Sequence, residues 1–201
     1  MSVTGILRLT AHTALVAAVL FLLWAAVRLW LLRTERKKGL PPPNKKAELL
    51  LWVFVFYLIC LVQITVFRYG INPQLWQTRE SLLETVNLVP LKHTIKLYYA
   101  YTKWYFYYNL LGNILWFVPL GALLPAVSDS GKPPRRRGFW YCTAAGLCCS
   151  LCIELLQLLF VTGITDIDDL LFNTLGAALG YGLYRLIALP RVRRNKGLHN
   201  K

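Results

Sequence analysis

Long apolar segments dominate this chain. A helix needs about 20 consecutive, mostly apolar residues to cross the hydrocarbon core of a bilayer. Five segments meet this requirement, and a polar or Pro-rich break separates each from the next: 6–32, 49–67, 109–126, 139–161 and 169–189. We therefore predict an all-α fold, a polytopic membrane helix bundle with about five transmembrane helices.

The composition agrees with a membrane environment. Hydrophobic residues make up 56% of the 201 residues, which is more than an ordinary soluble domain of this size contains. The net charge of +14 could indicate nucleic-acid binding, but the basic residues lie in short clusters between apolar runs. We interpret these clusters as topology signals and as contacts with anionic lipids, and we expect no nucleic-acid partner.

The basic clusters also predict the orientation of the chain. Lys and Arg are concentrated after the first apolar segment, after the third and in the C-terminal tail. Because they accumulate on the cytoplasmic side of membranes, we expect the N-terminus outside and the C-terminus in the cytoplasm. The expected domains are an N-terminal anchor helix with a basic cytoplasmic linker (1–48), a membrane core (49–189) and a basic cytoplasmic tail (190–201).

An aromatic segment precedes the third apolar segment on the predicted outer side. Residues 97–108 contain eight aromatic side chains in twelve positions. Tyr and Trp are enriched at the headgroup level of membranes, where their amphipathic rings are stable. We predict an extracytoplasmic interfacial helix here; the alternative is an aromatic belt that only anchors the following transmembrane helix.

Polar side chains within the apolar segments gather toward the predicted outer side. Ionisable groups inside a membrane are rare, so each one indicates a candidate site. The third segment begins with two asparagines, the fourth carries a glutamate and a glutamine near its outer end, and the fifth follows a run of aspartates. The candidate ligand-binding residues are Arg68, Asn109, Asn113, Glu154, Gln157, Asp166, Asp168, Asp169 and Asn173.

Small residues predict which face of the fifth segment is buried. Gly176 and Gly180 form a G-x-x-x-G pattern, which allows helix backbones to approach closely. Because residues three or four apart share one face of a helix, Asp169 and Asn173 should point into the bundle. The alternative is that these polar groups serve only to hold the helices together by hydrogen bonds.

Five motifs, taken in order, resemble the VanZ-like family. They are Phe67-Arg68, Asn87-Leu-Val-Pro90, Asn109-Leu-Leu-Gly-Asn113 with Phe117-Val-Pro119-Leu-Gly121, Glu154-Leu-Leu-Gln157, and the run from Asp166 to Tyr181. The resemblance spans residues 49–185 and adds Asn87 to the candidate ligand-binding residues. Members of this family are small bacterial membrane proteins associated with lowered susceptibility to teicoplanin-type lipoglycopeptides. A role at the outer face of the bacterial plasma membrane is therefore implied.

The resemblance favours a binding role. Teicoplanin carries a lipid tail and binds cell-wall precursors at the outer leaflet. An outward-facing polar site that binds a lipid or a lipid-linked cell-envelope component would change what is displayed there. The expected partners are this component and anionic lipids at the cytoplasmic face; a homo-oligomer is compatible with the sequence, and no cofactor or resident metal is expected.

The alternative function is a membrane-embedded enzyme that acts on a lipid headgroup. Its catalytic carboxylates would be Glu154, Asp166 and Asp169, with Glu154 or Asp169 as general base, or these residues together with Asp168 would bind a divalent cation. Helix capping is a complete structural explanation for Asp168. Transport is disfavoured because the chain has no visible internal repeat. We interpret His93 as a solvent-exposed loop histidine.

Overall fold

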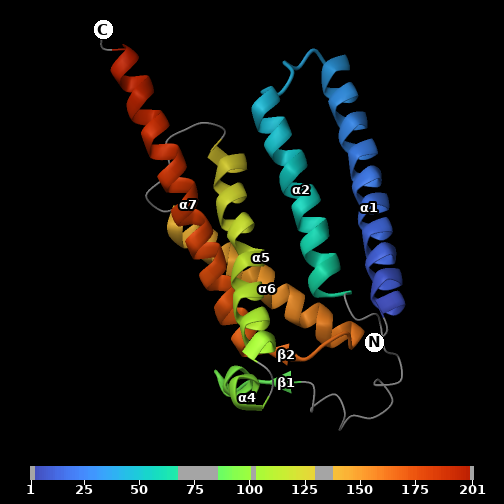
Figure 1. The fold of residues 1–201 in the computed structure, drawn as a ribbon. Coiled ribbons are helices and arrows are strands. Elements are labelled where there is room, and N and C mark those ends of the chain that lie inside the picture. Colours follow the sequence, from blue (N-terminus) through green and yellow to red (C-terminus); the bar gives the residue numbers. More distant parts are fainter. Residues whose placement is uncertain (1–2, 68–85, 101–102, 130–137, 200–201) are drawn as a thin grey trace. The chain divides into compact units, whose positions relative to one another are not determined.

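The computed structural model describes residues 3–67, 86–100, 103–129 and 138–199 (Figure 1). These residues form six α-helices and two short strands. The chain divides into two compact units, Met1–Gly70 and Ile71–Lys201. Arg68, one of the candidate ligand-binding residues, lies outside the described residues.

The first unit is a pair of helices, α1 (Val3–Lys37) and α2 (Lys45–Thr65). Arg28 and Glu48 form an ion pair between the two helices, with 2.7 Å between Nη2 and Oε2. Trp24 and Trp52 pack edge to face one turn away, with 5.0 Å between their ring centroids. Helix α2 therefore packs on α1, the predicted anchor helix. The expected domain boundary after residue 48 lies inside α2.

The second unit contains the remaining helices and both strands. Helices α5 (Lys103–Asp129), α6 (Gly138–Phe160) and α7 (Ile167–His199) pack together, and the short helix α4 (Lys92–Ala100) lies at one end of α5. Strands β1 (Val86–Asn87) and β2 (Thr165–Asp166) pair in parallel. Helix α7 continues through most of the predicted cytoplasmic tail to His199.

Glycines allow α5 and α7 to approach closely, as the G-x-x-x-G pattern predicts. A Cβ atom at Gly176 would collide with the carbonyl oxygen of Ile114, and one at Gly180 with that of Val118. From α5, a Cβ atom at Gly121 would collide with the carbonyl oxygen of Ala177. The backbones of the two helices are therefore in direct contact, which fixes the relative position of side chains at the ends of α5 and α7.

The structure confirms an all-α membrane helix bundle. In the described part of the chain, four helical segments are long and apolar enough to cross a membrane: Ala11–Lys37, Lys45–Thr65, Lys103–Ser128 and Gly138–Phe160. At most 22% of each span is buried within the protein, so its apolar side chains are available to lipid. Helix α7 is not among the four, and the fifth crossing stays a prediction.

The sequence predicts that the aromatic segment, residues 97–108, forms one interfacial helix, but in the structure it is divided between two helices. Its first part belongs to α4, and its second part forms the first turns of α5, which continues as a candidate membrane span. Tyr99 and Trp104 are 81% and 72% exposed, respectively. Helix α5 begins six residues before the predicted start at Asn109, so aromatic residues of this segment make up its first turns.

The close approach of α5 and α7 predicts opposite effects for two substitutions on α7. Alanine favours a helix over glycine by about 1 kcal/mol. We expect Gly182→Ala to preserve or raise the free energy of unfolding, because a Cβ atom there meets nothing within 4 Å. Gly180→Ala should lower the free energy of unfolding by about 1–3 kcal/mol, because its methyl group forces the helices apart. Denaturant unfolding of the detergent-solubilised chain measures both; equal effects would contradict the observed packing.

Candidate functional site

The pairing of β1 with β2 brings together two residues that are distant in the sequence. Asn87 lies opposite Asp166 in the parallel register. The Asn87 side chain donates a hydrogen bond from Nδ2 to Asp166 Oδ1, at 2.8 Å. Asn87 therefore positions the carboxylate that immediately precedes α7.

Asp166 caps the N-terminus of α7, and Glu154 holds Asp166 in place. The backbone N–H of Asp168 donates to Asp166 Oδ1 at 3.0 Å, which satisfies one of the free N–H groups of the first turn. The backbone N–H of Asp166 donates to Glu154 Oε2 at 2.9 Å. Glu154 and Asp166 are each 2% exposed. Both carboxylates thus hold the connection between α6 and α7.

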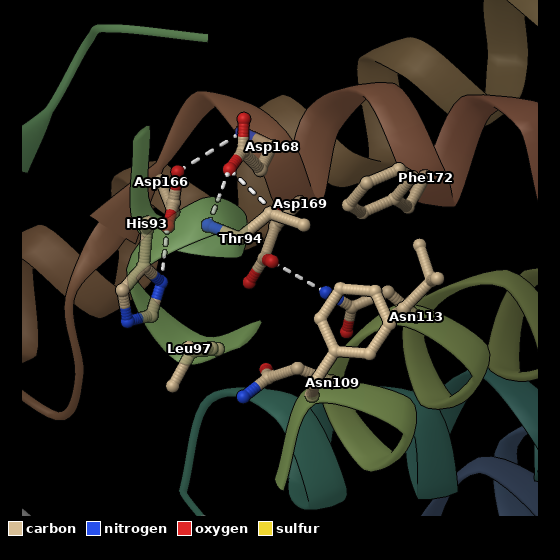
Figure 2. A pocket seen from close by; sticks show the side chains of 11 residues that line it. His93, Thr94, Leu97, Asn109, Asn113, Asp166, Asp168, Asp169 and Phe172 are labelled. Atoms are coloured by element: carbon tan, nitrogen blue, oxygen red, sulfur yellow. Dashed lines mark hydrogen bonds and ion pairs between the residues drawn. The ribbon is translucent and has the colours of Figure 1, made fainter. Parts of the chain in front are cut away.

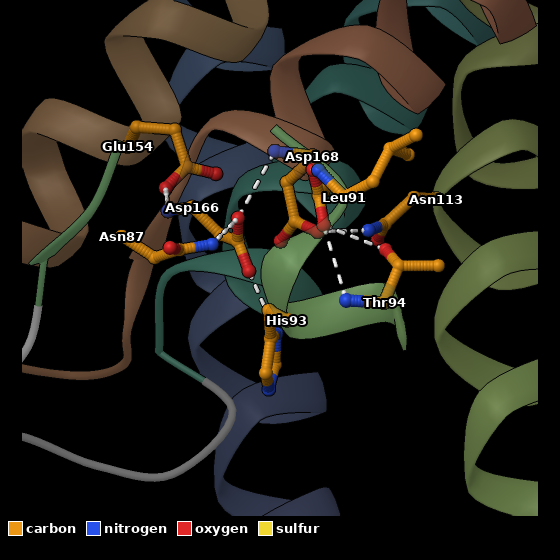
Figure 3. A network of polar contacts seen from close by, with 9 residues as sticks. Asn87, Leu91, His93, Thr94, Asn113, Glu154, Asp166 and Asp168 are labelled. Carbon is orange, nitrogen blue, oxygen red and sulfur yellow. Dashed lines mark hydrogen bonds and ion pairs between the residues drawn. The ribbon is translucent and has the colours of Figure 1, made fainter. Parts of the chain in front are cut away.

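Asp168 joins two helices (Figure 3). It lies in the first turn of α7 and accepts three hydrogen bonds from the start of α4. The backbone N–H of Leu91 donates to Oδ1 at 2.5 Å, while the backbone N–H and the hydroxyl of Thr94 donate to Oδ2 at 3.1 and 2.7 Å. One carboxylate therefore caps α4 while it also lies at the favourable, positive end of α7.

His93 is not a solvent-exposed loop residue, and this interpretation of the sequence is wrong. It lies in the first turn of α4, where Nδ1 is 2.6 Å from Asp166 Oδ2. The hydrogen bond to Asp166 raises the pKa of His93 above its usual 6.5, despite the opposing effect of burial. Burial alone would raise the pKa of Asp166, but hydrogen bonds from His93, from the amide of Asp168 and from Asn87 hold it below the usual 3.8.

Asp169 and Asn173 make separate contacts along α7. Asp169 Oδ1 accepts a hydrogen bond from Nδ2 of Asn113 on α5. One turn further on, Nδ2 of Asn173 donates to the hydroxyl of Ser150 on α6, at 2.9 Å. Both face into the helix bundle, as the sequence predicts; Asn173 is only 4% exposed, whereas Asp169 is partly exposed.

A recess lies between α4, the start of α5 and the start of α7 (Figure 2). We call it the α4–α7 recess. Its cavity volume is about 10 Å³, which is room for about one water molecule. Its polar and apolar lining residues are His93, Thr94, Leu97, Phe106, Asn109, Leu110, Asn113, Asp166, Asp168, Asp169 and Phe172.

The structure brings most of the candidate residues to this recess or next to it. Five of them line it: Asn109, Asn113, Asp166, Asp168 and Asp169. Asn87 and Glu154 lie one hydrogen bond behind it, and Asn173 lies deeper in the bundle. Gln157 is on α6 and does not line the recess. Sequence reasoning missed His93 and Thr94; their position just after the Asn87-Leu-Val-Pro90 motif is the one signal that could have indicated them.

The carboxylates do not form a metal centre in the described residues. No three His, Cys, Asp or Glu side chains there are placed so that they could hold one metal ion together. The oxygens of Asp166 and Asp168 are directed at backbone, amide and imidazole donors instead. The geometry therefore gives no support to the divalent-cation version of the enzyme hypothesis.

The His93–Asp166 pair predicts a pH-dependent stability. A histidine with a raised pKa stabilises the fold below its usual pKa of 6.5, and this contribution is lost as the pH rises through the raised value. Asp166, with a lowered pKa, contributes above 3.8. We expect the Tm of the purified chain to fall as the pH rises from about 6.5 through the raised pKa of His93, and His93→Gln to reduce this slope. His12→Gln, on α1, is the control; an unchanged slope in His93→Gln would contradict the pairing.

The family model described as VanZ/LLP1 matches residues 54–188, which include the whole α4–α7 recess. The chain is similar to Protein VanZ from Enterococcus faecium, with 28% identity over 134 residues that cover 67% of this chain and 72% of that protein. No solved structure matches significantly. Because the family model covers well over half of its length, the chain belongs to the VanZ-like family.

Proposed function

We propose that this chain lowers the susceptibility of a bacterial cell to teicoplanin-type lipoglycopeptides by binding a lipid or lipid-linked cell-envelope component in the α4–α7 recess. Membership of the VanZ-like family supports the link to these antibiotics. The observation that carries the binding role is the recess itself. It joins polar groups, among them the Asn109 amide, to apolar walls formed by Phe106 and Phe172.

The surroundings of the recess suit a guest that comes from a membrane. Exposed aromatic side chains, including Tyr98, Tyr99, Trp104 and Tyr105, lie on α4 and on the first turn of α5. Such side chains favour the headgroup level of a bilayer. A recess at that level would meet lipid headgroups, while acyl chains stay against the apolar surface of the spans.

The distribution of Lys and Arg supports an outward-facing recess. The basic connection and tail at the far ends of α5 and α7 belong on the cytoplasmic side by the positive-inside rule. The α4–α7 recess lies at the opposite ends of these helices and would then open toward the outer leaflet. Lipid-linked cell-wall precursors that teicoplanin binds are displayed on that side.

Two substitutions in the recess test this function. We expect Asn109→Leu and Asp169→Asn to reduce the protection that the parent chain gives against teicoplanin. The first replaces an amide of the recess by an apolar group, and the second replaces a carboxylate by a neutral amide, each at nearly constant size. The measurement is the minimal inhibitory concentration in a susceptible host, with membrane abundance of each variant determined by immunoblot. Glu35→Gln, on α1, is the matched control and should protect as the parent does. Full protection by both recess variants at normal abundance would refute the proposal.

The second candidate function is an enzyme with Asp169 as the general base. Of the three carboxylates proposed for catalysis, Glu154 and Asp166 are buried and engaged by backbone or side-chain donors. Asp169 lines the recess and is partly exposed. Among the described residues, it accepts one hydrogen bond, at Oδ1. A base must be able to reach the proton that it removes, which favours Asp169.

Lipid mass spectrometry separates the enzyme from the binding protein. An enzyme predicts a lipid species that appears or disappears when the parent chain is expressed and that is unchanged in cells with Asp169→Asn. A binding protein predicts the same lipid profile for parent, variant and empty host. We expect the second result, because Glu154 and Asp166, the other two carboxylates proposed for catalysis, are held by hydrogen bonds within the fold.

A further inference from the structure

One carboxylate in the α4–α7 recess is left largely unused by the fold. Asp168 accepts hydrogen bonds at both oxygens, and Asp166 accepts at Oδ1 and pairs with His93 at Oδ2. Among the described residues, Asp169 accepts only from Asn113, at Oδ1. Its second oxygen is therefore available to a guest in the recess that Asp169 lines (Figure 2).

Two asparagines add acceptors to this oxygen. Asn113 donates to Asp169 through its NH2 group, so the amide oxygen of Asn113 remains available as an acceptor. Asn109 lies one turn earlier on the same face of α5 and makes no hydrogen bond within the described residues. A carboxylate oxygen and two amide oxygens therefore give three acceptors in one recess.

The charge of the recess disfavours an anion. Three aspartates and one histidine line it, and that histidine is already paired with Asp166. Among the described residues that line the recess there is neither Lys nor Arg, so a phosphate or carboxylate guest would meet charges of its own sign there. A cation would be attracted by Asp169, which lines the recess together with the aromatic side chains of Phe106 and Phe172.

The size of the recess selects among cations. Its volume of about 10 Å³ is room for about one water molecule. A primary ammonium group has about this size, and its three N–H donors equal the number of free acceptors. A trimethylammonium group is larger and has no N–H donor.

We propose that the α4–α7 recess binds a primary ammonium group. This assignment rests on the proposed function and specifies its ligand chemistry. The ammonium group belongs to an aminoethyl phospholipid headgroup or to the amine side chain of a peptide on a lipid-linked precursor. In either case the remainder of the headgroup lies outside the recess, near the exposed aromatic side chains of α4.

The test compares two short-chain phospholipids that differ only in the nitrogen, one with an aminoethyl and one with a choline headgroup. Native mass spectrometry of the detergent-solubilised chain measures their affinities. We expect the parent to bind the aminoethyl lipid about 10- to 100-fold more tightly, as is typical for charge-assisted hydrogen bonds. Asp169→Asn and Asn109→Leu should reduce this preference, whereas Glu35→Gln should retain it. Thermal unfolding of each variant confirms that it is folded.

A second pair of probes identifies the source of the amine. A short lysine peptide is compared with the same peptide acetylated at the side-chain amine. Preference for the free amine over both lipids assigns the ligand to a peptide, and preference for the aminoethyl lipid assigns it to a phospholipid. The proposal is overturned if the parent distinguishes neither pair, or if its preference survives in both Asp169→Asn and Asn109→Leu.

The outcome also separates this inference from the proposed function. If the recess variants lose protection against teicoplanin but the parent shows no preference for a primary ammonium group, the ammonium assignment is wrong and the binding function stands. If the variants retain protection while the parent prefers the ammonium probes, the recess binds amines but the proposed function is wrong.

Discussion

Backbone N–H groups at the start of a helix require acceptors, and this requirement organises the end of the second unit where the recess lies. Asp168 supplies acceptors for α4, Asp166 supplies one for α7, and Glu154 accepts from the backbone of Asp166. An unsatisfied N–H group is most costly where water is excluded, as it is around the buried side chains of Asp166 and Asp168. Helix α4 has only nine residues, so its position over the recess depends strongly on Asp168.

The long elements could be predicted from the sequence because their signals are local. Apolar runs of sufficient length indicate the four candidate spans, and the spacing of Gly176 and Gly180 predicts a close helix contact. The face of α7 that bears Asp169 and Asn173 follows from the same helical period. The sequence predicts that Asp168 caps its own helix; in the structure Asp166 caps α7, and Asp168 caps α4 instead.

The recess could be predicted only in part because it is built by contacts between distant residues. Leu91 and Asp168 are separated by 77 positions, and the pairing of Asn87 with Asp166 spans 79. The sequence predicts one helix for the aromatic segment, which in the structure contains the end of α4 and the start of α5. Helix α4 has neither the length nor the apolar composition of a span, so its sequence gives no separate signal. The sequence also gives no sign that His93 is paired, because its partner Asp166 is remote in sequence.

The two interpretations of the buried polar residues, as helix contacts or as a binding site, are not exclusive at the level of atoms. Both oxygens of Asp168 are occupied by hydrogen bonds that hold α4, whereas one oxygen of Asp169 holds Asn113 and the other is available. The contacts made by Asp166 and Asp168 form the walls of the recess in which Asp169 is presented. A polar group in a membrane protein is retained where it stabilises the fold, and the carboxylate that the fold leaves incompletely satisfied is the one suited to a ligand.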